Sequence, residues 1–157
     1  YIVYHQTGSN SIYNDYRKAQ EFKSPNYHPF VYADTAAQSK YLQTSSVVIS
    51  RSGAHIMAEL LYFHRPSVQI PIPWGSHQEQ QKNAEFLASQ NLAVILPQDQ
   101  LTPQSLLESI SKVQTLKPKN YDFNIYKAAE RNGKISEANI KAGKYIANMD
   151  NPNWGTI

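Results

Sequence analysis

Short apolar runs along the chain alternate with segments whose apolar residues recur at helical spacing. The β-branched run at 46–50 is of the kind buried on both faces of a parallel sheet, and helical spacing follows it. This alternation predicts an α/β fold, a parallel sheet flanked by helices. The predicted strands are 1–5, 28–32, 46–50, 67–72 and 92–96, and the predicted helices are 12–22, 35–43, one ending near Phe63, 78–89, and one opening at 101–110 with Thr102 as N-cap.

The rhythm of strands and helices changes after Leu116. Polar helices are predicted at 124–132 and 136–149, before a loose end. We therefore expect an α/β domain over residues 1–115 and a C-terminal helical extension over residues 116–157.

Composition narrows the class of protein. The chain has 157 residues, 41% of them hydrophobic, which suits one domain with a substantial core. It has no cysteine, so disulfides and thiolate metal sites are excluded. The net charge of +3 is small and Lys and Arg are scattered among acids, so no nucleic-acid partner is expected. The longest apolar runs are far shorter than the roughly 20 residues of a membrane-spanning helix.

The joint between the run at 46–50 and the next helix holds Arg51, Ser52 and Gly53. Gly53 permits close approach to the backbone, and free N–H groups at a helix start beside an arginine suit a phosphate. The alternative is an ordinary βα turn in which Ser52 merely caps the helix. These residues alone leave both interpretations open.

Glu59 and a group of amides are further candidates for ligand binding. Glu59 is a surface acid in one interpretation; in the other, with a phosphate at the helix start, it binds two ribose hydroxyls. The helix after the next strand concentrates amides at Gln78, Gln80, Gln81 and Asn83. Amides suit recognition of neutral sugar hydroxyls, although glutamines on helices are more often only solvated.

The loops after parallel strands meet at one edge of a sheet, so those after the first four predicted strands are expected to face one crevice. His5, His55 and His77 also fall there, but their spacing matches no local metal motif, so we expect no metal site. The absence of a G-x-S-x-G motif argues against a serine hydrolase.

Five segments, taken in order, resemble the MurG family of UDP-N-acetylglucosamine transferases. They are HQTG at 5–8, SRSGAHIMAEL at 50–60, IPIPW at 70–74, HQEQQKNA at 77–84 and LPQDQLTPQSL at 96–106. The resemblance runs from residue 1 to about residue 113. It implies the GT-B architecture of two Rossmann-like domains, of which this chain resembles an incomplete C-terminal half that binds the sugar nucleotide.

The resemblance also implies roles for individual residues. The implied substrate-binding residues are Arg51, Ser52, Gly53 and Ala54 at the diphosphate, Glu59 at the ribose hydroxyls, Gln80 and Gln81 at the N-acetylglucosamine hydroxyls, and Phe30 and Val31 at the uracil edge. His55 and Ile56 depart from the commoner Leu-Thr pair of the family, so a side-chain hydroxyl contact to phosphate is not expected there.

The implied reaction is the inverting transfer of N-acetylglucosamine from UDP-GlcNAc to lipid I, which forms lipid II in peptidoglycan synthesis. No metal or other cofactor is implied. The acceptor-binding N-terminal domain, with its catalytic base, and a glycine-rich loop are expected before Tyr1, so the chain alone is expected to be inactive. The complete enzyme is expected in the cytoplasm, peripheral on the inner face of the plasma membrane.

Two other functions are compatible with the same residues. One is a non-catalytic subunit that binds a nucleotide sugar and needs a partner. The other is a related transferase that uses another UDP-sugar or another glycolipid acceptor, or an epimerase of similar fold.

Overall fold

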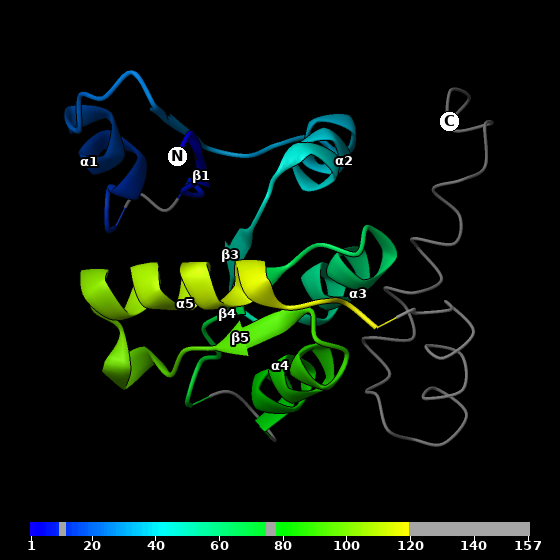
Figure 1. Ribbon diagram of the computed structural model, residues 1–157. Coiled ribbons are helices and arrows are strands. Elements are labelled where there is room, and N and C mark those ends of the chain that lie inside the picture. The colour runs from blue at the N-terminus through cyan, green and yellow to red at the C-terminus, as the bar shows by residue number, and fades with distance from the viewer. Residues whose placement is uncertain (10–11, 75–77, 120–157) are drawn as a thin grey trace. The chain divides into compact units, whose positions relative to one another are not determined.

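The computed structural model describes residues 1–9, 12–74 and 78–119 (Figure 1). The chain divides into two compact units, Tyr1–Thr44 and Ser45–Ile157, and each has its own parallel sheet. The predicted alternation of strands and helices is confirmed in both units, since every strand predicted from the sequence overlaps an observed one. The α/β class, with parallel sheets flanked by helices, is therefore confirmed.

Some predictions fall on residues that the structure does not describe. They concern the helices at 124–132 and 136–149 and the position of His77. The division into a domain at 1–115 and an extension at 116–157 therefore stays a prediction.

The first unit is a small βαβα arrangement. It holds β1 (Val3–Gln6), α1 (Asp15–Glu21), β2 (Tyr27–Phe30) and α2 (Thr35–Thr44). β1 and β2 pair in parallel, with Val3 beside Tyr27 and Gln6 beside Phe30. The carboxyl ends of both strands therefore lie at the same edge of this sheet.

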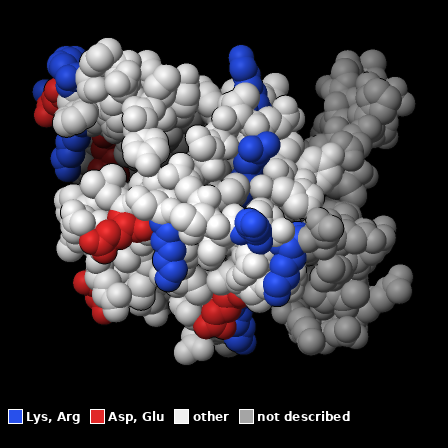
Figure 2. Space-filling model, viewed as in Figure 1, with Lys and Arg blue, Asp and Glu red and all other residues white. Residues whose placement is uncertain are grey.

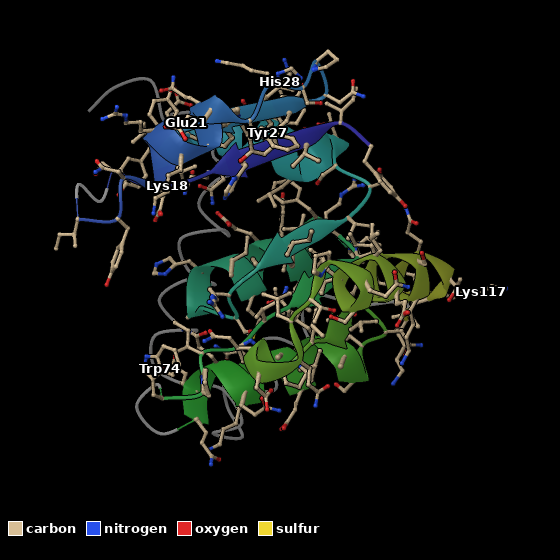
Figure 3. All side chains as sticks on the ribbon, turned by 90° about the vertical axis from the view of Figure 1, so that its left-hand side faces the viewer. Lys18, Glu21, Tyr27, His28, Trp74 and Lys117 are labelled. Carbon is tan, nitrogen blue, oxygen red and sulfur yellow. The ribbon has the colours of Figure 1, made fainter. Side chains whose placement is uncertain are left out.

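Aromatic rings pack on one face of the first sheet. Tyr4 stacks on His28 with 5.1 Å between ring centroids, and Tyr4 and Phe30 lie 4.9 and 5.2 Å from Tyr41 of α2. Tyr27 precedes His28 on β2 (Figure 3). Because consecutive side chains of a strand point to opposite faces, Tyr27 belongs to the other face of the sheet. This aromatic packing holds α2 on the sheet.

The second unit holds a three-stranded parallel sheet in the order β3-β4-β5. Its elements are β3 (Val48–Ser50), α3 (Ala54–Tyr62), β4 (Ser67–Gln69), α4 (Glu79–Ser89), β5 (Ala93–Ile95), the 3₁₀ turn η2 (Gln98–Gln100) and α5 (Pro103–Thr115). The register places Ser50 beside Gln69 and Gln69 beside Ile95. β4 is thus the central strand.

The core of the second unit forms where helices cover this sheet. α5 contacts β4 and β5, and its Val113 packs with Val68, Ile70, Val94 and Leu96 (Figure 1). α4 contacts β5 and also packs against α3, six of whose nine residues are buried. α3 and α4 are thus fixed against each other, and they carry the candidate site.

The predicted burial of the run at 46–50 on both faces is wrong for Ile49. Its side chain is 46% exposed, whereas every residue of β4 is buried. Ile49 is exposed because β3 is an edge strand of the sheet β3-β4-β5. It pairs there with one neighbour, β4.

Charged side chains of both signs appear in the view of Figure 2. Among the described residues, no helix is long and apolar enough to cross a membrane.

The start of α5 is fixed by a capping box, which confirms Thr102 as the N-cap. The Thr102 hydroxyl accepts a hydrogen bond from the backbone N–H of Ser105 at 3.1 Å, and the Ser105 hydroxyl accepts one from Thr102 N–H at 2.9 Å. Pro103 occupies the first helical turn, where its missing N–H does no harm.

We predict that Thr102→Ala lowers the free energy of unfolding by about 1 kcal/mol, because the N–H of Ser105 loses its acceptor. Thr102→Ser keeps a hydroxyl there and should stay close to the wild type. Urea unfolding of the three proteins measures the difference. An unchanged midpoint for Thr102→Ala would show that the capping box adds nothing.

Candidate functional site

The turn of residues 51–54, called the 51–54 turn below, joins β3 to α3. Gly53 is the N-cap of α3, with an extended backbone at φ −69° and ψ 160°, and its carbonyl accepts a hydrogen bond from Met57 N–H at 3.1 Å. The interpretation of Ser52 as the helix cap is therefore wrong. The backbone N–H groups of Ala54 and His55 make no hydrogen bond within the described part of the chain. The start of α3 thus offers free donors.

Ser52 turns its side chain inward rather than toward the helix end. The side chain is fully buried, and its Oγ has no hydrogen-bond partner among the residues that the structure describes. Most buried polar groups in folded proteins are paired. The hydroxyl therefore keeps its bonding capacity unused next to the free N–H groups of α3.

The fold itself does not require a glycine at position 53. Its φ is negative, and a Cβ built on it would meet no heavy atom within 4 Å. The space beside Gly53 is therefore open in the folded chain. A bound group can approach the backbone there.

Arg51 is held at the same edge of the sheet. Its side chain is exposed, but one terminal nitrogen (NH1) donates to the carbonyl of Ile70 at 3.0 Å. A guanidinium has five N–H donors, so most of them stay available while its position is restrained. The restraint keeps a positive charge beside the start of α3.

The adjacent glutamines of α4 are engaged in opposite ways. Gln80 accepts a hydrogen bond from Ile72 N–H through Oε1 at 3.0 Å, and Gln81 donates through Nε2 to Oε1 of Glu85 at 2.8 Å. Because a backbone N–H must face an amide oxygen and a carboxylate an amide NH₂, these partners fix both orientations. Gln80 is left with its NH₂ group, and Gln81 with its carbonyl oxygen.

Of two buried amides near the 51–54 turn, Gln69 was missed in the sequence, and Asn83 was named only as a member of the amide group at 78–83. Asn83 of α4 donates from Nδ2 to the carbonyl of Ser52 at 2.9 Å, and the amide of Gln69 exchanges contacts of 3.2 and 3.4 Å with the Ser50 hydroxyl. An amide inside the apolar run at 67–72 was the signal for Gln69. For Asn83 the signal was its place in the amide cluster of α4.

Glu59 lies in the second turn of α3, as predicted, but the interpretation as a surface acid is wrong. Its side chain is only 5% exposed. α3 is buried around much of its circumference by its packing, α4 included, so even a carboxylate position is covered. A carboxylate so little exposed to water needs hydrogen-bond donors around it.

Phe30 and Val31 lie at the carboxyl end of β2 in the first unit. The Phe30 carbonyl accepts hydrogen bonds from the backbone and side chain of Thr7 at 2.9 and 3.1 Å, and the Val31 carbonyl accepts one from Gly8 N–H at 3.0 Å. The N–H of Val31 makes no hydrogen bond within the described residues. It is a free backbone donor at this edge.

The loops after neighbouring parallel strands meet at one edge within each unit. Gly8 bonds to Val31 across the first sheet, and Arg51 bonds to Ile70 across the second. The Tyr32 phenol lies near the same edge of the first unit and is exposed. Hydrogen bonds from Ser9 lower its pKa.

The meeting of all four loops in one crevice stays a prediction, because the two sheets belong to separate units.

The histidines do not gather around a metal in the described residues. His5 contacts the Tyr27 hydroxyl through Nδ1 at 2.6 Å, and His55 is exposed at the start of α3. Across residues 1–9, 12–74 and 78–119, no group of three or more His, Asp or Glu side chains could hold a metal ion. His77 lies outside these ranges.

Comparison with known proteins identifies similar sequences. The profile of the glycosyltransferase family 28 C-terminal domain matches residues 1–142. A protein of Trichodesmium erythraeum (strain IMS101) named UDP-N-acetylglucosamine--N-acetylmuramyl-(pentapeptide) pyrophosphoryl-undecaprenol N-acetylglucosamine transferase is 34% identical over 104 residues, 66% of this chain and 26% of its own length. Its namesake from Gloeothece citriformis (strain PCC 7424) is 32% identical over 149 residues, 95% of this chain and 37% of its own length.

A solved structure is similar in fold. The crystal structure of Acinetobacter baumannii MurG matches with a TM-score of 0.54 and 22% sequence identity, covering 90% of this chain and 36% of that one. The chain thus spans between a quarter and two-fifths of the length of the relatives it matches.

Gly53→Ala tests whether the open space in the 51–54 turn serves a ligand. We predict a change of no more than about 1 kcal/mol in the free energy of unfolding, since the backbone is unstrained and the added methyl meets open space. Binding of inorganic pyrophosphate should weaken, because the methyl occupies the approach to the helix start. Calorimetric titration and urea unfolding measure the two effects. Undiminished pyrophosphate binding would contradict the role of this space.

Proposed function

The chain belongs to the family of glycosyltransferase family 28 C-terminal domains, and from this premise we propose that it is the sugar-nucleotide-binding part of a MurG-type transferase. The complete enzyme would move N-acetylglucosamine from UDP-GlcNAc to lipid I and so form lipid II in peptidoglycan synthesis. The names of the relatives from Trichodesmium erythraeum and Gloeothece citriformis support this reaction.

The proposal rests chiefly on the arrangement of the 51–54 turn. Free N–H groups at the start of α3 lie there beside the open space at Gly53, and the adjacent Ser52 has a buried hydroxyl without a partner among the described residues. The positive end of the helix dipole adds to the charge of Arg51. A diphosphate is the group of a sugar nucleotide that this combination suits, and Ala54 supplies one of the N–H groups.

Neutralisation of the diphosphate is also the chemistry that the reaction needs. When the sugar leaves UDP, negative charge builds up on the departing diphosphate, and fixed donors aimed at that charge lower the barrier. In this proposal Arg51 and the backbone amides provide the stabilisation, so no metal is obligatory.

Glu59 would bind the two ribose hydroxyls of the uridine. It lies about one turn further along α3 than the proposed diphosphate site, the direction in which the ribose of a bound UDP would extend. A carboxylate accepts two hydrogen bonds from a diol without needing a proton of its own. Its burial makes such charge-assisted bonds strong.

In this proposal Gln80 and Gln81 hydrogen-bond to the sugar hydroxyls. Phe30 and Val31 contact the edge of the uracil ring. The free NH₂ of Gln80 and the free carbonyl oxygen of Gln81 provide one donor and one acceptor on consecutive residues of α4. The unpaired N–H of Val31 is suited to a uracil carbonyl, with Phe30 preceding it.

The chain contributes no catalytic base in this proposal. The base and the lipid I site are expected in an N-terminal domain of the complete enzyme, as the resemblance implies. Lipid I is membrane-bound, so the enzyme is proposed to work in the cytoplasm, peripherally on the inner face of the plasma membrane.

Glu59→Gln is the sharpest test of the ribose site, because it keeps the buried volume and removes only the charge. We predict about fivefold weaker binding of UDP, since hydrogen bonds to a neutral acceptor are worth roughly 1 kcal/mol less than those to a carboxylate. The preference for UDP over 2′-deoxy-UDP should narrow as well. Calorimetric titration of both ligands gives the two quantities.

Glu108→Gln on the exposed face of α5 is the matched control, and it should bind both ligands like the wild type. If Glu59→Gln preserves the wild-type preference between UDP and 2′-deoxy-UDP, Glu59 has a structural role only.

Gln81→Ala tests the sugar site. We predict that binding of UDP-GlcNAc weakens by about 1 to 3 kcal/mol, whereas UDP binding hardly changes, because the uridine contacts lie elsewhere. Gln104→Ala is a matched control, since Gln104 makes the same kind of bond, to Glu108 at 2.7 Å, on α5. Equal losses for both ligands in Gln81→Ala would refute the assignment.

A further inference from the structure

We propose that Asn83 is a positioning residue, whose buried side-chain amide fixes the direction in which the 51–54 turn presents its N–H groups. The inference rests on the proposed function, because it takes the diphosphate as the ligand of this turn. Asn83 would not touch the ligand. It would act through the peptide bond between Ser52 and Gly53.

The contact that carries this inference is short and sheltered. Nδ2 of Asn83 donates to the carbonyl oxygen of Ser52 at 2.9 Å, and the Asn83 side chain is 4% exposed. Little water can compete for this carbonyl, so an unmade bond would leave a buried polar group unpaired. The side chain of Asn83 therefore has a strong preference for this geometry.

Peptide geometry transmits this contact to the ligand side of the turn. The bond between Ser52 and Gly53 is trans, so its C=O and N–H point in opposite directions. Asn83 holds the C=O, and the Gly53 N–H is thereby turned away from Asn83. That N–H makes no hydrogen bond within the described residues, so it joins the free donors at the start of α3.

The glycine at position 53 increases the need for the hydrogen bond from Asn83. Gly53 has no Cβ to limit its dihedral angles, and no neighbouring atom lies within 4 Å of the place where a Cβ would be. Gly53 therefore adds no side-chain contact that would limit the rotation of this peptide. The amide of Asn83 supplies the restraint, while the open space stays available for a ligand.

The same amide links the two proposed halves of the site. Asn83 lies on α4 three residues after Gln80, which is tied by its own oxygen to Ile72 at the exit of β4. The turn proposed for the diphosphate and the helix proposed for the sugar are thus joined by one buried bond. Their spacing is set by the protein before any ligand binds.

Asn83→Asp is the test, because it keeps the shape and replaces the NH₂ donor with an oxygen that repels the Ser52 carbonyl. In the unliganded chain the backbone amide NMR resonance of Gly53 should shift. The Kd for UDP should rise about tenfold, the value of one hydrogen bond to a charged group. Asn83→Ala gives the same two readouts if the aspartate variant does not fold.

Asn91→Asp is the matched control, since Asn91 also donates its amide to a backbone carbonyl, that of Lys117 at 3.2 Å. It should leave both the Gly53 resonance and the Kd for UDP unchanged. If Asn83→Asp loses only thermal stability and keeps the wild-type Kd, the inference is overturned. If the wild type does not bind UDP, the proposed function fails, and an unmoved Gly53 resonance in Asn83→Asp then overturns the inference separately.

Discussion

The parallel pairing of β3 with β4, which sets Ser50 beside Gln69, decides where the candidate site of the second unit lies. Parallel strands end at the same edge, so the turn after β3 and the segment after β4 emerge together. Three hydrogen bonds connect the segments at that edge. They join Arg51 to Ile70, Ile72 to Gln80 and Asn83 to Ser52. A slip of one residue in the register would turn each side chain of the strand to the other face and break this arrangement.

The central strand β4 carries a buried polar side chain at each end, and both are paired. Gln69 is bonded to Ser50, and the Ser67 hydroxyl donates to the carbonyl of Leu92 at 3.1 Å. A polar network that is fully bonded fixes one arrangement of the backbone. Ser52 departs from this rule, because its buried hydroxyl lacks a partner among the described residues. The exception lies where the bound anion is proposed.

The elements of the second unit could be predicted because its apolar periodicity follows burial, whereas β1 and α1 were predicted although neither has a buried residue. The edge position of β3 could not, since pairing partners are absent from a local pattern, and the exposure of Ile49 follows from it. Glu59 was ambiguous because acids on helices are usually solvated, whereas α3 is covered around much of its circumference. The role of Asn83 depends on a partner 31 residues away, which no spacing rule reveals. Family membership is confirmed, while the roles of the individual site residues stay proposals.

The opposed engagement of Gln80 and Gln81 has a consequence for substrate analogues. A sugar hydroxyl within reach of both would accept a hydrogen bond from the Gln80 NH₂ and donate one to the Gln81 carbonyl oxygen, so only an intact alcohol satisfies both. A fluorine atom in place of this hydroxyl can accept the hydrogen bond from Gln80 at most, because it has no proton to donate to Gln81. A CH₂ group in its place makes neither hydrogen bond. An epimer with that oxygen on the opposite side of the ring would move it out of reach of the pair. The two glutamines together would therefore recognise stereochemistry at one carbon, which neither could do alone.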